Sequence, residues 1–321
     1  MRRVLVTGAN GFLGGHLVEH FLERTPWDVV AMVRPDEAGD AHHLLDLPTV
    51  ATHLARVHVV CHDLRYAIEE ETAERIGTVE AVAHLAGNTN VGKSLDDPRP
   101  FVLDNVVGTC NLLEYYRRYV PYATMVNLGS ADVYGPSPHV ICREWDTWHP
   151  LTPYAGTKAG QVALGMAYAA SFGLPIVTAL TIGLFGERQP PGRLFSTAIA
   201  RLKRGLPVPV YPGASRTWLY VRDAAEAISF LLQRGQSGHV YNLSGSDCKE
   251  NEEVVEAIAE IMGVPARIER LTDPPRPGHA GKYQADASKL ARLGWSPRTP
   301  FPIALRQTVE YTLAHPDTLW A

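Results

Sequence analysis

A glycine-rich turn near the N-terminus constrains the fold of this chain more than any other feature of its sequence. The run Thr7-Gly8-Ala9-Asn10-Gly11-Phe12-Leu13-Gly14 follows a short apolar stretch at residues 3–7 and opens an apolar-periodic stretch at residues 12–22. In such a run the glycines allow a tight turn, a close approach of backbone to a pyrophosphate, and close helix–strand packing. The first N–H groups of the helix would face the phosphates. The context predicts a dinucleotide-binding unit. Its expected cofactor contacts are Gly8, Asn10, Gly11, Phe12, Leu13 and Gly14.

Strand-like and helix-like segments alternate along the rest of the N-terminal half. Further strands are expected at residues 29–33, 57–61, 79–85 and 123–128, and a helical segment at residues 101–119. This alternation predicts an α/β fold with a Rossmann-type, doubly wound parallel sheet. Helical patterns then return between clusters of proline and glycine, at residues 194–204, 223–233, 252–262 and 302–313. We expect an NAD(P)-binding domain over residues 1–187 and a smaller α/β substrate lobe over residues 188–321, with segments that can interleave.

Bulk properties narrow the class of protein. The net charge of −4 over 321 residues argues against a nucleic-acid binder, which usually has a basic excess. No apolar run approaches the roughly 18 residues that a membrane helix needs, and the N-terminal residues have no signal-peptide organisation. The four cysteines are far apart and form no pair with metal-ligand spacing. A cytoplasmic protein without a metal site is therefore expected.

The end of the second expected strand bears on the choice of cofactor. NAD enzymes usually place a carboxylate there for the ribose 2′-hydroxyl, whereas this chain has Val33 followed by Arg34. A guanidinium suits a 2′-phosphate and favours NADP, with NAD as the alternative, although a solvated loop arginine would look the same in the sequence. Other cofactor contacts are expected after the third and fourth strands, at Asp63, Leu64, Leu85, Ala86 and Gly87.

A catalytic pair is expected at Tyr154 and Lys158, which precede a long apolar segment. Residues four apart share one face of a helix, so the phenol and the ammonium can lie together. A nearby cation is expected to lower the tyrosine pKa, so that the phenolate can take the proton of a substrate hydroxyl. The pair alone also fits a plain surface helix. Ser130, at the end of another expected strand, would share a hydrogen bond with the reacting hydroxyl.

Together these motifs resemble the extended short-chain dehydrogenase/reductase family, in its branch of nucleotide-sugar epimerases and dehydratases. Segments similar to that branch continue along the chain, from residues 84–94 and 105–109 through residues 216–223 to residues 276–295. The resemblance implies a nucleotide-diphosphate sugar as substrate, a tightly held NAD(P), and a homodimer through helices near 101–118 and 158–172. It adds Asn105, Tyr154 and Lys158 to the cofactor contacts. The substrate contacts that it implies are Asn88, Thr89, Arg193, Tyr211, Arg216 and Arg276.

The resemblance also implies a first step that dehydratases and epimerases share. In this step C4 of the sugar is oxidised to a ketone, which acidifies the C5 proton. A 4,6-dehydratase then removes that proton and loses water from C6, whereas a 4-epimerase returns hydride to the other face of C4. Asp132 stands at the position of the base, which favours the dehydratase, while Ala131 stands where many dehydratases have an acid. Asp132 could instead bond a nearby backbone N–H. Two other positions depart from the family pattern, because Gly183 replaces a substrate-side asparagine and Glu187 replaces a proline.

Two other functions fit part of the same pattern. An NADPH-dependent ketoreductase acting on a 4-keto sugar nucleotide would use Ser130, Tyr154 and Lys158 equally well. A non-catalytic NADP-binding protein on the same fold would not need these three residues, and their presence argues against it. The fold alone does not decide between these functions.

Overall fold

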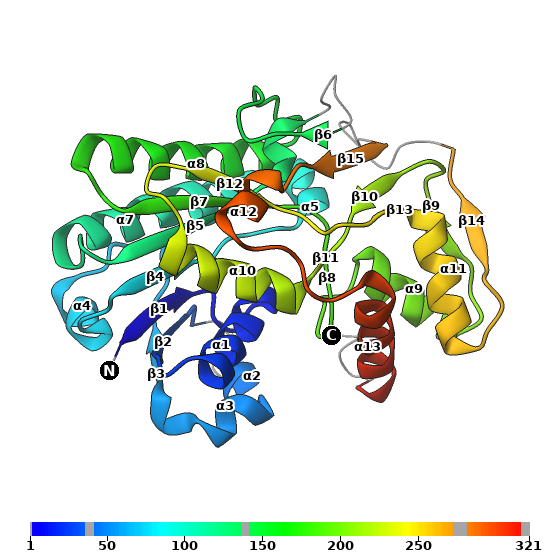
Figure 1. The fold of residues 1–321 in the computed structure, drawn as a ribbon, viewed down its shortest axis with the longest axis horizontal. Helices are drawn as coiled ribbons and strands as arrows, with labels where there is room; N and C mark the ends of the chain where they lie inside the picture. The colour runs from blue at the N-terminus through cyan, green and yellow to red at the C-terminus, as the bar shows by residue number, and fades with distance from the viewer. Residues whose placement is uncertain (1, 36–41, 136–140, 273–280, 316–321) are drawn as a thin grey trace.

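A seven-stranded parallel sheet forms the centre of the protein (Figure 1). The computed structural model describes residues 2–35, 42–135, 141–272 and 281–315. The strands of the large sheet are β1 Arg3–Thr7, β2 Asp28–Val33, β3 Val57–Cys61, β4 Ala81–His84, β5 Thr124–Ser130, β7 Ile176–Thr181 and β12 Val240–Leu243. Their order in the sheet is β12-β7-β5-β4-β1-β2-β3, the doubly wound arrangement with β1 at the point where the strand order reverses. The predicted fold class is confirmed.

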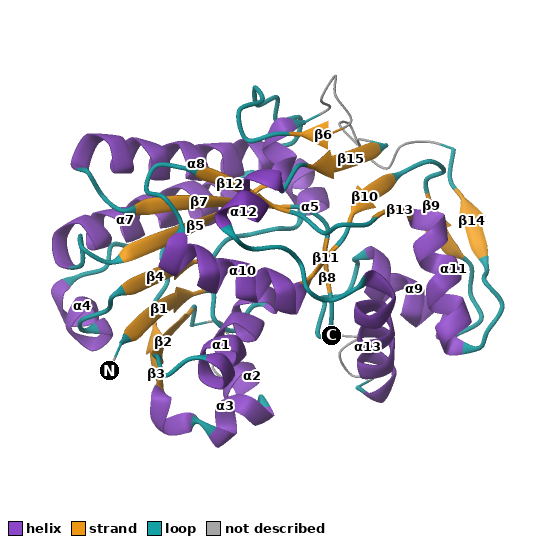
Figure 2. Cartoon of the chain, viewed as in Figure 1, coloured by secondary structure: helices purple, strands orange, loops and turns teal. Residues whose placement is uncertain are grey.

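Helices cover both faces of this sheet (Figure 2). On one face lie α1 (Phe12–Arg24) and α10 (Val221–Arg234), and on the other α4 (Glu70–Ile76), α7 (Gly108–Tyr119) and α8 (Pro153–Phe172). Side chains of neighbouring β1 residues point to opposite faces of the sheet. Val4 and Val6 belong to the hydrophobic core beneath α1 and α10, and Leu5 belongs to the core beneath α4 and α7. Short helices complete this part: α2 His42–Leu45, α3 Pro48–Thr52, α5 Val91–Asp96 and α6 Arg99–Phe101.

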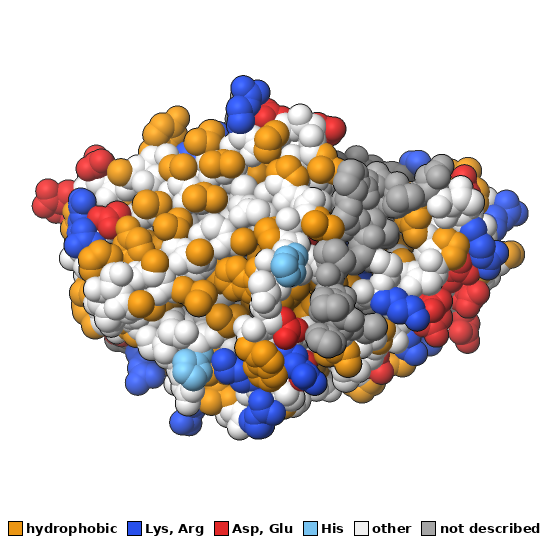
Figure 3. Space-filling view, turned by 90° about the horizontal axis from the view of Figure 1, so that it is seen from above, with side chains coloured by type: hydrophobic (Ala, Val, Ile, Leu, Met, Phe, Trp, Pro, Cys, Tyr) orange, Lys and Arg blue, Asp and Glu red, His pale blue; other side chains and the backbone are white. Residues whose placement is uncertain are grey.

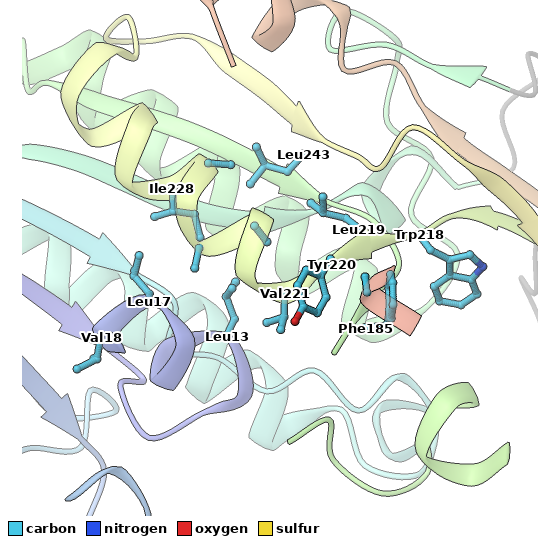
Figure 4. Packing of buried hydrophobic residues seen from close by; sticks show 14 of the residues in the cluster. Leu13, Leu17, Val18, Phe185, Trp218, Leu219, Tyr220, Val221, Ile228 and Leu243 are labelled. Carbon is cyan, nitrogen blue, oxygen red and sulfur yellow. The ribbon is translucent and has the colours of Figure 1, made fainter. Parts of the chain in front are cut away.

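The C-terminal part of the chain returns to the large sheet. Strand β12 pairs with β7 in parallel, and α10 packs against α1. Figure 4 shows Leu13 and Leu17 of α1 close to Val221 and Ile228 of α10. Each of these fully buried aliphatic side chains contributes roughly 1.5–3 kcal/mol to folding. Segments before and after residue 187 therefore interleave in the fold. The assignment of cofactor binding to residues 1–187 and of substrate binding to residues 188–321 stays a prediction.

A smaller lobe of helices and short strands lies beside the sheet, on the right in Figure 1. Its helices are α9 Leu194–Lys203, α11 Asn251–Met262 and α13 Phe301–Ala314, whereas α12 Ser288–Leu293 lies against β12 of the large sheet. The remaining strands are β6 Ile141–Cys142, β8 Leu184–Phe185, β9 Val208–Val210, β10 Ser215–Thr217, β11 Leu219–Tyr220, β13 Cys248–Glu250, β14 Ile268–Arg270 and β15 Lys282–Ala285. Four of them form a sheet in the order β13-β10-β15-β6.

Two segments differ from the sequence-based expectation. Residues 101–119 are not one regular helix, because a π-helical turn at Val102–Val107 separates α6 from α7. The strand expected to reach residue 85 ends at His84, since the backbone N–H of Leu85 donates to the hydroxyl of Thr7 rather than to a neighbouring strand. Both irregularities lie beside the expected cofactor site.

Within the described ranges, the structure has no helix that is both long enough and apolar enough to cross a membrane. The cytoplasmic location stays a prediction.

Candidate functional site

Three backbone segments meet at the glycine-rich turn. Gly8 has a φ of 68°, and a Cβ atom there would lie 2.9 Å from the backbone of Ala86 at the end of β4. A Cβ on Gly14 would lie 2.0 Å from the carbonyl oxygen of Gly8. Helix α1 starts at Phe12 without a side-chain cap, so its first N–H groups are available to a ligand. The turn has the geometry that a pyrophosphate cradle requires.

A cleft of about 480 Å³ opens from this turn along the carboxyl ends of the strands. It is lined by most of the residues expected to hold the cofactor: Gly8, Asn10, Gly11, Arg34, Asp63, Leu64, Leu85, Ala86 and Gly87. Phe12, Leu13 and Gly14 lie in the first turn of α1, with Leu13 and Gly14 buried behind the cleft. The structure thus gathers residues that are 80 positions apart in the sequence into one elongated site.

Two ion pairs lie on the wall of this cleft. Arg34 follows β2 and places its guanidinium 3.4 Å from the carboxylate of Asp104, and 55% of its side chain is exposed. Asp63 follows β3 and accepts hydrogen bonds from the guanidinium of Arg65. Burial alone would raise the pKa of the Asp63 carboxyl, but the hydrogen bonds from Arg65 hold it below the usual value. The wall therefore presents paired charges of both signs.

The same cleft includes three residues expected on the substrate side. Asn88, Thr89 and Arg193 line it beside the cofactor residues. The Arg193 guanidinium donates to the backbone carbonyl of Thr89 at 2.9 Å and to its hydroxyl at 3.1 Å. This contact joins the loop after β4 to the start of α9.

Sequence reasoning missed several residues that line the cleft: Met32, His62, Arg65, Asn90, Asp104, Pro190 and Pro191. Some of these adjoin predicted positions, since Met32 precedes Val33, Arg65 follows Leu64, and Asp104 precedes Asn105. The two prolines come from a segment that only the tertiary fold brings to the cleft.

Asn105, in the π-helical turn, connects the cleft to α8, the helix of Tyr154 and Lys158. It is fully buried, its amide oxygen accepts from the backbone N–H of Asn88 at 2.7 Å, and its amide nitrogen donates to the Thr157 hydroxyl at 2.9 Å. A Cβ on Gly87 would lie 2.8 Å from the same amide oxygen and 3.9 Å from the Lys158 ammonium. Asn105 and Lys158 therefore lie next to Gly87, which forms part of the floor of the cleft.

A buried histidine supports this floor and was not foreseen from the sequence. His84, at the end of β4, shares hydrogen bonds with the hydroxyls of Thr7 at 2.8 Å and Thr109 at 2.9 Å. Burial, with a smaller effect of Lys158, lowers the pKa of His84 to about 3. The imidazole is therefore neutral at physiological pH, and it can accept one hydrogen bond and donate the other.

Tyr154 on α8 and Ser130 at the end of β5 lie together, and Lys158 follows one turn further along α8. The Ser130 hydroxyl bonds the Tyr154 phenol and also accepts from the backbone N–H of Asp132 at 3.2 Å. Burial lowers the pKa of Lys158 to about 7, and burial followed by the charge of Asp132 raises the pKa of Tyr154. The expectation of a lowered tyrosine pKa is wrong for this structure, because burial disfavours the phenolate more than Ser130 and Arg193 favour it.

Asp132 lies in a short 3₁₀ turn directly after β5 and is half-buried. It does not cap that turn, because the cap is the Ser130 hydroxyl, and its own carboxylate accepts no hydrogen bond from the described residues. Asp132 acts electrostatically on Tyr154 and on Tyr283 of β15. Arg216 of β10 lies over the Tyr283 ring at 5.8 Å. Tyr283, which sequence reasoning missed, therefore interacts with both Asp132 and an expected phosphate contact.

The other expected substrate residues are less closely placed by the described contacts. Tyr211 is half-buried just after β9, and Arg276 lies outside the described residues. Gly183 has a φ of 53°, and a Cβ there would meet the Thr217 carbonyl at 2.8 Å. This close approach explains why glycine, rather than a larger polar residue, stands at position 183.

Glu187 belongs to a buried polar cluster. Its carboxylate accepts from the Tyr220 hydroxyl at 2.7 Å and from the Arg222 guanidinium at 3.1 Å. The next residue, Arg188, has a φ of 63° and forms an ion pair with Glu19 of α1. Glu187 and Arg188 therefore anchor the segment that leads to Pro190, Pro191 and Arg193.

Comparisons with known proteins agree with this geometry. The model of the GDP-mannose 4,6-dehydratase family matches residues 5–308. A dTDP-glucose 4,6-dehydratase of an Actinoplanes species is 33% identical over 324 residues, covering 98% of each chain. The solved structure of a dTDP-glucose 4,6-dehydratase from Streptomyces venezuelae with NAD bound has a TM-score of 0.88 and 26% identity over 98% of each chain. A UDP-glucose 4-epimerase from Thermus thermophilus in complex with NAD has a TM-score of 0.82 and 29% identity, covering 96% of this chain and 98% of its own.

Two adjacent glycines of α1 provide a matched test of the cradle. Gly14→Ala should abolish dinucleotide binding and destabilise the fold, because its Cβ would lie 2.0 Å from the Gly8 carbonyl oxygen. Gly15→Ala should leave binding intact and gain up to about 1 kcal/mol of helix propensity, since its nearest new contact would be a Leu47 methyl group at 3.5 Å. Calorimetric binding and chemical denaturation of both variants check this, and equal behaviour of the two would contradict the cradle.

Proposed function

The chain belongs to the GDP-mannose 4,6-dehydratase family, and on that premise we propose that it is a nucleotide-sugar 4,6-dehydratase working with a bound nicotinamide dinucleotide. Its membership confirms the resemblance seen in the motifs. The observation that carries the choice of reaction is Asp132, a half-buried carboxylate close enough to Tyr154 to raise the phenol pKa. The carboxylate has no hydrogen-bonding role among the described residues that would account for its place beside the tyrosine.

The cradle supports the proposed cofactor. At Gly8 and Gly14 a side chain would collide with backbone, so glycine there lets β1, α1 and the end of β4 pack closely, as in a dinucleotide-binding turn. The residues that would hold the dinucleotide are the lining residues of the cleft, with Asn105 and Lys158 beneath its floor. When bound, the nicotinamide supplies the reversible two-electron oxidation of a sugar alcohol.

In this proposal the phenolate form of Tyr154 takes the proton of the C4 hydroxyl. Ser130 bonds the phenol and orients the same hydroxyl. The hydrogen bond from Ser130 and the positive charge of Arg193 both lower the pKa of Tyr154 against the effect of burial. Lys158, four residues further along α8, keeps its ammonium on the same helix face.

Asp132 then acts on C5 of the 4-keto sugar. The ketone acidifies the C5 proton, and the Asp132 carboxylate removes it. The C5–H electron pair forms the C5=C6 bond while the C6–O bond breaks. Ala131 has no acidic group and is fully buried, so the proton that Asp132 has taken is passed to the departing hydroxyl, which leaves as water. Return to C6 of the hydride removed from C4 and addition of a solvent proton to C5, through the Asp132 carboxyl, then saturate the C5=C6 bond. Oxidation at C4 and reduction at C6 balance, so no net redox change occurs.

A panel of nucleotide hexoses tests this reaction in deuterated water without added NADPH. We expect a 4-keto-6-deoxy product with deuterium at C5, read by NMR. Asp132→Asn should lower kcat by about 10²–10⁴-fold, because it removes the base. The exposed Asp97→Asn serves as the control and should retain activity. A C4 epimer without deuterium would instead identify an epimerase, and turnover only with NADPH and a 4-keto sugar nucleotide would identify a ketoreductase.

We propose NADP as the preferred form of the cofactor, through Arg34. Its half-exposed guanidinium lines the cleft, and β2 ends without the carboxylate that would bond a ribose 2′-hydroxyl. Asp104 opposes this preference, because its carboxylate already pairs with Arg34. The related dehydratase and epimerase described above have NAD bound. The choice therefore depends on whether a 2′-phosphate displaces Asp104 from the guanidinium.

Titration calorimetry with both dinucleotides checks this preference. Arg34→Ala should weaken NADP binding by about 10- to 100-fold, the loss expected for a charge-assisted hydrogen bond, and leave NAD binding nearly unchanged. Arg99→Ala removes a similarly paired, exposed arginine outside the cleft and should change neither affinity. Equal loss for the two dinucleotides would contradict the role of Arg34.

We also propose that the chain forms a homodimer. Large apolar side chains are exposed on the π-helical turn and on α8, at Val102, Leu103, Met166 and Phe172. Figure 3 views the protein from the side on which α8 lies in Figure 1 and shows many hydrophobic groups across this face. A contiguous apolar surface is typical of a protein–protein contact.

Sedimentation checks the dimer. The wild-type protein should sediment at twice the 35.2 kDa chain mass. Met166→Glu should yield monomers, because it would bury an unpaired charge in the interface. Leu206→Glu alters an equally exposed apolar residue in the smaller lobe and should remain dimeric. A monomeric wild-type protein would overturn the proposal.

A further inference from the structure

Helix α8 presents a third polar residue on the face that carries Tyr154 and Lys158. Gln161 follows Lys158 by three positions and is fully buried. Residues spaced by four and three positions lie one above the other on a helix, so Gln161 points to the same strand as the catalytic pair. That strand is β5, which ends at Ser130. No motif in the sequence had singled out Gln161.

Gln161 and Asn127 of β5 bond each other reciprocally. The Gln161 amide nitrogen donates to the Asn127 amide oxygen at 3.0 Å, and the Asn127 amide nitrogen donates to the Gln161 backbone carbonyl at 3.1 Å. One turn further along α8, a Cβ on Gly165 would lie 2.5 Å from the Asn127 amide nitrogen. Helix α8 and strand β5 therefore lie very close together at Gln161 and Asn127, and this pair fixes the position of the helix along the strand.

The same amide holds the catalytic lysine. The Lys158 ammonium donates to the Gln161 amide oxygen at 2.6 Å and to the Leu128 carbonyl at 2.6 Å. The Gln161 amide nitrogen also reaches the Leu128 carbonyl, at 3.2 Å. The side-chain oxygen and nitrogen of Gln161 are thus both bonded, and a fully bonded buried network of this kind specifies one arrangement.

We propose that Gln161 is a positioning residue that, anchored by Asn127, fixes the Lys158 ammonium relative to Ser130 and Tyr154 through a neutral amide. This inference rests on the proposed function, since it concerns the same catalytic group. Gln161 touches neither the cleft nor the expected position of the substrate, so it acts only through the lysine and the helix register.

The Gln161 amide is neutral and so does not stabilise the charged form of Lys158 as a carboxylate would. Burial therefore decides the pKa of the lysine. Lys158 interacts electrostatically with His84 from β4, which is neutral, and Tyr154 lies one turn earlier on the same helix. Strand β5 contributes only a carbonyl and an amide. No carboxylate of the described residues is bonded to Lys158, and burial lowers its pKa to about 7. The ammonium is therefore present below about pH 7 and is lost above it, so activity that needs the charge falls as the pH rises through 7.

The variant Gln161→Glu tests the neutral amide by an almost isosteric change. A carboxylate beside the ammonium should raise the lysine titration midpoint by about 1–2 pH units. The midpoint is read in the cofactor-free protein by NMR of ¹³Cε-labelled lysine, with Lys158→Met to assign the signal. Gln233→Glu makes the same chemical change on the exposed side of α10 and should leave the midpoint unmoved. An unmoved midpoint in Gln161→Glu would overturn the proposal.

The variant Gln161→Leu tests positioning. It keeps the volume but releases the ammonium and the Asn127 amide, so kcat should fall by about 10- to 100-fold while KM for the nucleotide sugar stays within about threefold. Gln161→Glu still bonds the ammonium and should retain more of the wild-type kcat below pH 7. A drop in thermal stability with unchanged kcat would reduce Gln161 to a structural role and overturn the proposal. Because the lysine titration needs no substrate, it decides the question even if no nucleotide hexose is converted.

Discussion

The close contact of three backbones at Gly8 is the constraint on which the rest of the site depends. β1, the start of α1 and the end of β4 can meet there only because Gly8 and Gly14 have no side chain. This contact puts the N-terminus of α1 beside the loop after β4, at the reversal point of the sheet. A cleft follows directly from that arrangement, and the strand ends deliver the polar groups that line it.

Neutral amides then connect this cleft to α8, the helix of the proposed catalytic pair. Asn105 joins the loop after β4 to Thr157, and Gln161 joins Lys158 to β5. Both amides are fully buried and bonded through their side-chain oxygen and nitrogen, so the positions of Tyr154 and Lys158 are set without any buried carboxylate partner. The charged residues Asp132, Arg193 and Arg216 are half-buried or exposed, unlike these two amides. This arrangement suits a reaction in which the charged residues act on the substrate while the buried amides stay in place.

Much of this arrangement could be predicted from local patterns. The glycine turn, the spacing of Tyr154 and Lys158, and Ser130 at a strand end each follow from the geometry of one helix or strand. The pKa of Tyr154 could not be predicted in the same way, because burial by surrounding segments raises it against the expectation. Nor could Tyr283 and His84, which matter through neighbours that are more than 20 residues away in the sequence. Asn88, Thr89 and Arg193 were expected beside a sugar nucleotide, yet they line the same cleft as the cofactor residues.

The sequence by itself determined the α/β class and the strand–turn–helix at the N-terminus, and it predicted the proposed catalytic side chains, because each depends on contacts within a few residues. Only the tertiary structure decided that residues 240–243 complete the large sheet, that Pro190 and Pro191 reach the cleft, and that Gln161 holds the lysine. These features arise from pairing and burial between segments far apart in the chain. The charge states of Tyr154 and Lys158 belong with them, since solvent is excluded from these groups only after the segments have packed.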